Sequence, residues 1–198
     1  MLRAMRPLPV LLPLSLLAGC ATLPEPPAAA APTVFTAAAF DRQGIGGTLA
    51  EGVADPATGR AASVDDPVRV ASVSKLVTAI GVMRLVEDGR LSLDAEVAPM
   101  LGLAMPQRVT LRMLLSHTSG LRDHEDRYAI PLGETLAEVL ADPRSWDPNH
   151  SAGSGYFTYS NLNFVVVGSL VERVTGERFD RFMHRSVLGP LKLGACFN

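Results

Sequence analysis

The sequence predicts a chain of mixed α/β class, of the α+β type, in which an antiparallel β region precedes a group of helices. Two β-prone runs, at 34–40 and 48–53, flank a polar glycine-rich stretch, which is the pattern of a hairpin. Farther along, apolar residues recur at helical spacing over 72–89 and over 164–176. With 47% hydrophobic and 19% charged residues among 198, the chain holds enough apolar material for one main domain.

The first twenty residues have the pattern of a secretory signal peptide. Arg3 and Arg6 precede a short apolar stretch at 8–17, and small residues follow. Leu17-Ala18-Gly19-Cys20 resembles the bacterial lipobox, in which the cysteine is diacylated and becomes the first mature residue. Residues 1–20 are therefore predicted to be a lipoprotein signal peptide, and the protein is expected to be exported and lipid-anchored through Cys20 to a bacterial membrane facing the periplasm. The alternative is a plain signal peptide in which Cys20 is incidental.

Residues 21–33 are predicted to form a tether, because 21–32 hold four prolines and five alanines without an apolar period. The folded domain is then expected over 34–198. If Cys20 carries lipid, Cys196 has no cysteine partner, so no disulfide is predicted. Cys196 is expected to be a small buried hydrophobic residue.

After the hairpin, turns are predicted at 55–59 and 65–67 from their proline, glycine and aspartate content. A largely buried helix is expected to begin at Ser72 and to end at Gly89. Its apolar positions recur at Val73, Leu76, Val77, Ile80 and Met83, with Leu85 and Val86 widening the face.

The rest of the chain is predicted to be helical with loops between. Residues 91–108 are predicted to be loop-rich, and Thr110 is expected to cap a short helix that ends at Leu115. Further helices are predicted over 132–140, from about 164 to a stop at Gly176, and over 178–187, with a glycine-rich loop over 147–155.

The most informative motif is Ser72-Val73-Ser74-Lys75, which places a hydroxyl and an amine on one face of the predicted helix. Only two of the eighteen Lys and Arg residues are lysines, Lys75 and Lys192. A base must be able to lose its proton, which a guanidinium does not do in proteins. The helix N-terminus favours the anionic form of Ser72, and burial is expected to lower the pKa of Lys75.

Ser72 and Lys75, and the polar or aromatic residues His117, Tyr159 and Asn161 farther along the chain, also have structural interpretations. Ser72 could be an N-cap and Lys75 an exposed helix lysine, Tyr159 a packed aromatic residue, and Asn161 the cap of the next helix. His117 suggests a Ser-His-Asp triad, but the chain has no Gly-x-Ser-x-Gly nucleophile elbow, so a structural role is predicted for it.

The sequence predicts no nucleic-acid partner, no cofactor and no metal. The formal net charge is −2, and the arginines are isolated rather than gathered in a basic stripe. Gly44-Ile45-Gly46-Gly47 lacks the third spaced glycine of a phosphate-binding loop. Asp123, His124 and Glu125 are of metal-ligating type, but their spacing fits no usual ligand set and predicts a solvated loop.

Three motifs in order carry a family resemblance: Ser72-Val73-Ser74-Lys75, the segment Leu114-Leu115-Ser116-His117-Thr118-Ser119-Gly120-Leu121, and Tyr159-Ser160-Asn161. Together they resemble the superfamily of serine beta-lactamases and penicillin-binding proteins. The Tyr-x-Asn form points to the branch of class C beta-lactamases, related D-alanyl-D-alanine carboxypeptidases and esterases. The resemblance covers 34–198 and implies a beta-lactamase/transpeptidase-like fold, with a helical subdomain and an antiparallel sheet that is incomplete in this chain.

The resemblance also implies a role for each motif residue. Ser72 would be the acylated nucleophile, Lys75 its activating base, and Tyr159 the group that passes the proton to the leaving group. Asn161 would bind the substrate's amide and help to orient Lys75. The backbone N–H of Ser72 would be one oxyanion donor.

The third motif of the family, Lys-Thr-Gly or His-x-Gly on a strand, is absent from this sequence. Lys192-Leu193-Gly194 imitates it but has Leu in place of the hydroxyl residue, and it is predicted to be a connector. The chain is therefore expected to be a C-terminally truncated form with weak or no activity, and its N-terminal hairpin is expected to expose an edge.

The implied function is that of a serine hydrolase with an acyl-enzyme intermediate, acting on a beta-lactam, a D-Ala-D-Ala peptide or an ester. The alternative is a non-catalytic penicillin-binding or sensor-type lipoprotein that is acylated without turnover. A third hypothesis, accidental motifs in an unrelated helical lipoprotein, requires Lys75 to be exposed and far from Tyr159.

Overall fold

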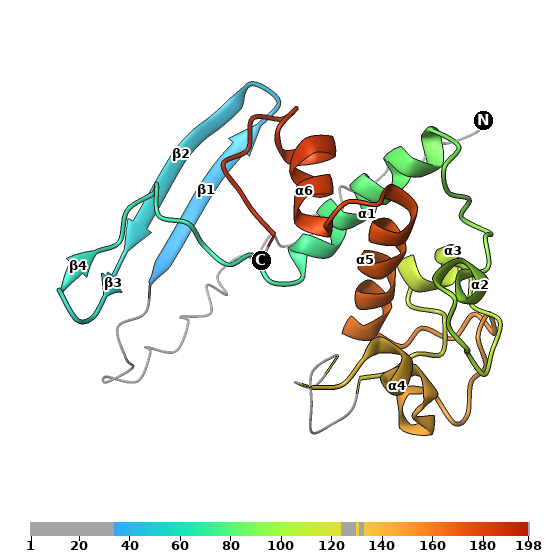
Figure 1. Cartoon of the computed structure of the whole chain (residues 1–198). Coiled ribbons are helices and arrows are strands. Elements are labelled where there is room, and N and C mark those ends of the chain that lie inside the picture. Colours follow the sequence, from blue (N-terminus) through green and yellow to red (C-terminus); the bar gives the residue numbers. More distant parts are fainter. Residues whose placement is uncertain (1–33, 124–129, 131–132, 198) are drawn as a thin grey trace, which may run out of the picture. The chain divides into compact units, whose positions relative to one another are not determined.

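The computed structural model describes residues 34–123, 130 and 133–197 (Figure 1). The predicted signal peptide and tether, with Cys20, lie outside the described residues, as do His124 and Glu125. The chain forms two compact units, which divide between Asp66 and Pro67. Strands make up the first unit and helices the second, in agreement with the predicted α+β class.

The N-terminal unit contains the predicted hairpin. Strand β1 (Phe35–Asp41) pairs antiparallel with β2 (Gly44–Glu51). The connection is a two-residue turn, so β2 begins earlier than the glycine-rich stretch suggested. Asp41 makes this tight turn, because its carboxylate accepts hydrogen bonds from the N–H groups of Gln43 and Gly44 at 2.8 and 3.2 Å.

A second, smaller hairpin follows, formed by β3 (Val53–Asp55) and β4 (Arg60–Ala61), and it contains the turn predicted at 55–59. Each sheet within the described residues has two strands, so every strand is an edge strand. The apolar side chains of the first hairpin are solvent-exposed, with Phe40 80% and Ile45 72% accessible. The edge exposure expected from the sequence is therefore present.

Six α-helices and two single turns of other helical type form the second unit within the described ranges. They are α1 (Val73–Glu87), α2 (Val97–Leu101), α3 (Leu111–Leu115), α4 (Leu136–Ala141), the 3₁₀ turn η1 (Pro143–Ser145), α5 (Asn161–Thr175), α6 (Phe179–Met183) and the π turn η2 (His184–Leu188). None of the helices described is long and apolar enough to cross a bilayer.

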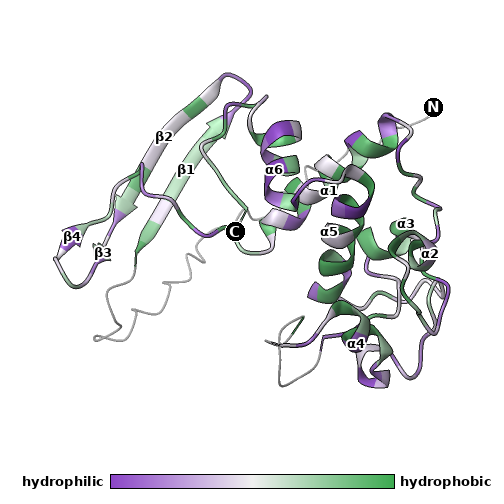
Figure 2. Cartoon of the chain, viewed as in Figure 1, coloured by the Kyte–Doolittle hydropathy of each residue, from purple (hydrophilic) through white to green (hydrophobic). Residues whose placement is uncertain are grey.

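Helix α5 is the centre of this unit, because α2, α3 and α6 all pack against it (Figure 1). Figure 2 shows hydrophobic residues over much of α5 and on α2 and α3 beside it. The fully buried side chains of α5 are Leu162, Asn163, Val166, Val167, Leu170 and Val171. The core thus forms around α5 and holds its first turn in a fixed position.

Local signals at the helix ends explain where these helices start and stop. Thr110 caps α3 as predicted, with Oγ1 accepting from the N–H of Met113. Gly176 ends α5 in the left-handed conformation, φ 73°, as predicted. Helix α2 was not predicted, because it is a five-residue helix within the proline-containing stretch 91–108.

The prediction that the helix after Ser72 is largely buried was wrong for one of its faces. Val73 and Leu76 are 60% and 66% accessible, and Ile80 and Met83 are also exposed. The buried residues of α1, Thr78, Gly81, Val82 and Leu85, lie on another face. The apolar spacing in the sequence includes residues on both the exposed and the buried face of α1. It does not indicate which face packs against another element of the chain.

The C-terminal segment corrects a second prediction. Cys196 is exposed, not buried, because the chain after η2 continues as turn and coil with Leu191 and Leu193 also exposed. Lys192 lies in a turn with φ 53°, and Leu193 N–H donates to the carbonyl of Leu188 at 2.9 Å. The segment Lys192-Leu193-Gly194 is turn and coil and not a strand.

We expect Leu170→Ala to lower the free energy of unfolding by about 3 kcal/mol, because it opens a cavity at a side chain with 0% exposure. Leu76→Ala is the matched control and should cost less than about 1 kcal/mol, since Leu76 is exposed. Urea unfolding followed by the fluorescence of Trp146, the single and buried tryptophan, measures both. Equal losses for the two variants would contradict the exposed face of α1.

Candidate active site

The first turns of α1 and α5 meet and bring the three motif segments together. Ser72 Oγ and Tyr159 OH share a hydrogen bond of 2.6 Å, although the two residues are 87 positions apart. Lys75 Nζ donates to Ser72 Oγ at 3.2 Å and to Asn161 Oδ1 at 2.7 Å. The four residues predicted from the sequence thus form one connected cluster.

Ser72 occupies the N-cap position of α1, but its hydroxyl makes no capping hydrogen bond. Its Oγ instead faces Tyr159 and Lys75, which contradicts the interpretation of Ser72 as a simple N-cap. The preceding residue, Ala71, has φ 44°, a conformation that costs a residue with a Cβ atom about 1–2 kcal/mol. This strained residue precedes the position where Ser72 presents its hydroxyl.

Lys75 is half-buried, and its ammonium lies against two aromatic rings. Nζ is 5.0 Å from the centroid of the Tyr159 ring and 5.7 Å from that of Phe164. The hypothesis of accidental motifs required an exposed Lys75 far from Tyr159, and neither condition holds. Lys75 is the only described lysine that shares a hydrogen bond with a motif serine.

The environment of Tyr159 makes its phenol more acidic than usual. Hydrogen bonding with Lys75, and next with Ser72, lowers the pKa of Tyr159 below its ordinary value of 10.0. A nearby ammonium favours the phenolate, which is the form that can accept a proton. Tyr159 is 46% exposed, so part of this residue is open to solvent.

Asp123 corrects the prediction of a solvated loop at this position. Its carboxylate accepts four hydrogen bonds from the start of α5, with donor–acceptor distances of 2.7 to 3.1 Å. The donors are Ser160 Oγ, the N–H groups of Asn161 and Leu162, and Asn161 Nδ2. Burial raises the pKa of Asp123, but these bonds outweigh it and leave the pKa below its ordinary value.

His117 is buried and supports the loop that carries Tyr159, in agreement with its predicted structural role. Its carbonyl accepts from the Thr158 N–H at 2.9 Å, and its Nδ1 accepts from the Ser160 N–H at 3.3 Å. Its ring packs against Tyr159 with centroids 4.7 Å apart. Burial, and next the positive charge of Lys75, lower the pKa of His117 below 6.5.

The Ser72 N–H is also available at this site. Within the described residues no acceptor binds it, and it lies at the start of α1, where the helix dipole is positive. Such an N–H can stabilise an oxyanion that forms on a carbonyl attached to Ser72. No group of three or more potential metal ligands occurs among the described side chains.

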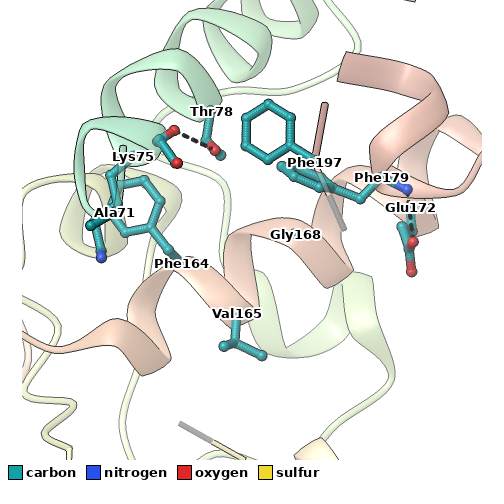
Figure 3. Close-up of a pocket in the computed structure, with 10 residues that line it drawn as sticks. Ala71, Lys75, Thr78, Phe164, Val165, Gly168, Glu172, Phe179 and Phe197 are labelled. Carbon is teal, nitrogen blue, oxygen red and sulfur yellow. Dashed lines mark hydrogen bonds between the residues drawn. The ribbon is translucent and has the colours of Figure 1, made fainter. Parts of the chain in front are cut away.

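A cavity of about 390 Å³ adjoins the cluster on the other side of Lys75 (Figure 3). It lies between α1 and α5, with Lys75 and Phe164 toward one end and Phe179 and Phe197 toward the other. Ser72 does not line it. Lys75 thus belongs both to the lining of this largely apolar space and to the hydroxyl cluster.

Similarity to known proteins identifies the family of this chain. Residues 28–197 match the family described as Beta-lactamase. The chain belongs to the beta-lactamase family. It is 34% identical over 171 residues to Esterase EstB of Burkholderia gladioli, and 31% identical over 157 residues to Penicillin-binding protein 4 of Amycolatopsis lactamdurans.

These matches cover 74% and 73% of the chain but only 42% and 39% of the two relatives, so the chain spans less than half of their length. The octameric penicillin-binding protein homologue from Pyrococcus abyssi superposes with a TM-score of 0.71 and 23% identity. That superposition covers 81% of this chain and 39% of the other. The beta-lactamase/transpeptidase-like fold predicted from the sequence is thereby confirmed.

The buried, neutral state of His117 predicts acid sensitivity. Because the pKa of His117 is lowered in the folded state, the unfolded chain binds more protons near and below pH 6.5. Stability from this group is therefore present above the unfolded pKa of 6.5 and is lost as the pH falls below it toward the lowered pKa of the folded state. We expect His117→Asn, which tolerates the local φ of 56°, to reduce this loss in urea unfolding.

The matched control for this experiment is His184→Asn, because His184 is an exposed histidine of the same unit. This variant should show the same change in the free energy of unfolding between neutral and acidic pH as the wild type. If His117→Asn kept it as well, protonation of His117 would not be the cause of the acid sensitivity.

Proposed function

We propose that this chain is a serine hydrolase of the beta-lactamase family in which Ser72 is acylated by a carbonyl substrate. One observation carries the proposal: Ser72 Oγ is hydrogen-bonded at the same time by Lys75 Nζ and by Tyr159 OH. A serine hydroxyl is a weak nucleophile until a neighbouring group takes its proton. Two groups that can exchange protons with it are in place here.

In the proposed acylation, the proton that Lys75 and Tyr159 can exchange rests on Tyr159, so that Lys75 is a neutral amine. It accepts the Ser72 proton as Oγ attacks the carbonyl carbon. The Ser72 N–H donates to the oxyanion of the tetrahedral intermediate. When the bond from carbon to the leaving group breaks, Tyr159 gives its proton to that group and regains one from the Lys75 ammonium. An acyl-Ser72 ester and a free alcohol or amine result.

Deacylation follows the same proton path in the other direction. Water attacks the ester carbon and loses a proton to Tyr159, which at the same time gives its own proton to neutral Lys75. The Lys75 ammonium then passes that proton to Ser72 Oγ as the bond from Oγ to carbon breaks. The products are the carboxylic acid and free Ser72. The water thus supplies the hydroxyl of the acid, and all protons are accounted for.

A carboxylic ester, a beta-lactam and a D-Ala-D-Ala peptide are all proposed substrates, because each offers a carbonyl with a leaving group. The similarity to an esterase and to a penicillin-binding protein supports the first two classes. Asn161 is proposed to bind a substrate amide with the Nδ2 hydrogen that does not bind Asp123. We also propose slow turnover for the 198-residue chain, because the described part offers one oxyanion donor and a missing donor costs about a hundredfold or more.

The proposal of a serine nucleophile is tested by intact mass. We expect the full chain to gain the mass of an acyl group after incubation with a fluorescent penicillin or p-nitrophenyl acetate. Ser72→Ala should abolish this adduct, because no other described serine is bonded to Lys75. Ser74→Ala is the matched control two residues away and should be labelled like the wild type. Equal labelling of Ser72→Ala would refute the assignment.

The same assay separates the alternatives. Lys75→Arg should slow acylation by about a hundredfold or more, since arginine cannot act as the base. Release of the label with time indicates a hydrolase. A stable penicillin adduct without release favours the sensor-type lipoprotein, which would keep acylation but lack turnover.

We also propose that the protein is exported and lipid-anchored through Cys20, because Leu17-Ala18-Gly19-Cys20 has the lipobox pattern. Cys20→Ala should move the protein from the membrane fraction of expressing bacteria and remove incorporation of labelled palmitate. Cys196→Ala is the matched cysteine control and should change neither. Palmitate labelling that persisted in Cys20→Ala would contradict the lipobox.

A further inference from the structure

We infer that Asp123 is a positioning residue, which fixes the orientation of the Asn161 side-chain amide and through it the position of Lys75. The inference rests on the proposed function, because it assigns a task within the same site. Two hydrogen bonds form the path: Asn161 Nδ2 donates to Asp123 Oδ2 at 2.7 Å, and Lys75 Nζ donates to Asn161 Oδ1 at 2.7 Å.

A carboxylate determines the orientation of the amide because it only accepts hydrogen bonds when it is ionised. The Asn161 side chain has an oxygen at one end and an NH₂ group at the other. Opposite Asp123, the NH₂ group must face the carboxylate, and the oxygen must then face Lys75. The orientation of Asn161 thus follows from the charge of its neighbour.

This orientation decides how Lys75 can act. An amide oxygen accepts an N–H of Lys75 and leaves the lone pair of the neutral amine free for the Ser72 proton. In the flipped orientation the NH₂ group would face the amine, where it would either meet other donors or donate to that lone pair. Lys75 would then lose its capacity as a base for Ser72.

Capping of α5 does not account for all the contacts of Asp123. The hydroxyl of Ser160 already accepts from the Leu162 N–H at 3.2 Å and serves as the N-cap of α5. Asp123 adds bonds to two N–H groups and to the Ser160 hydroxyl, which set its carboxylate in one place. The remaining bond goes to the Asn161 side chain, which is the group that contacts Lys75.

The hydrogen bonds around Asp123 keep its carboxylate ionised at the position where it faces the Asn161 amide. The four hydrogen bonds favour its ionised form, in which all four donors have an acceptor. In the variant Asp123→Asn, the new side-chain NH₂ group would face some of these donors. If this new NH₂ group faced the Asn161 side chain, the Asn161 oxygen would turn toward residue 123. The Asn161 NH₂ group would then face Lys75.

The test combines Asp123→Asn with Asn161→Ala in a cycle of acylation rates, measured with p-nitrophenyl acetate on the full chain. We expect Asp123→Asn to slow acylation about tenfold or more in the wild-type background. In the Asn161→Ala background it should have no further effect, because the amide through which it acts is gone. Additive effects of the two substitutions would overturn the inference.

Glu138→Gln is the matched control, because Glu138 is also a carboxylate that accepts hydrogen bonds at a helix start, in the capping box of α4. It should leave the acylation rate at the wild-type value. If Asp123→Asn does not fold, Asp123→Ser replaces it, since serine can still cap a helix but does not require an NH₂ group opposite it.

A second measurement does not depend on activity. The side-chain ¹H–¹⁵N resonances of Asn161, assigned by their loss in Asn161→Ala, should shift in Asp123→Asn and stay in place in Glu138→Gln. Unchanged resonances in Asp123→Asn would overturn the inference. If the wild type is not acylated, the proposed function fails, whereas the role of Asp123 in orienting the amide is still decided by these resonances. Shifted resonances with a wild-type acylation rate would overturn the positioning role.

Discussion

The hydrogen bond between Lys75 Nζ and Asn161 Oδ1 joins the first turns of α1 and α5, and the geometry of the site depends on it. Ser72 and Tyr159 are both exposed, so burial alone does not hold their hydroxyls 2.6 Å apart. Because each lies within one turn of a residue of this bond, the helices place them together. A contact between two helix starts thus turns two separate motifs into one site.

Next to this contact lies a layer of buried polar groups that have hydrogen-bond partners. His117 and Asn163 are buried beneath Tyr159 and Ser160, and they hydrogen-bond with one another and with the backbone. Among the described residues, no buried side-chain nitrogen or oxygen lacks a hydrogen-bond partner. A polar layer of this kind limits movement of the groups above it, because any shift leaves a buried group unpaired.

Much of the fold could be predicted because its signals are local. The hairpin follows from two β-prone runs around a turn, and the limits of α3 and α5 follow from Thr110 and Gly176. The burial of α1 and of Cys196 could not be predicted in this way. Burial depends on which elements the chain brings against a face, and neither apolar spacing nor residue type contains that information. For the same reason Asp123 was interpreted as part of a solvated loop.

The sequence by itself determined the chemistry that is available here: a serine and a lysine one helical turn apart, and a tyrosine and an asparagine two residues apart, in the order typical of the beta-lactamase family. The tertiary structure alone decided that Ser72 meets Tyr159 and that Asp123 contacts Asn161. The physical reason is the range of the forces involved. Helical spacing relates residues within a turn or two, whereas these contacts join residues 87 and 38 positions apart and depend on how the helices pack around α5.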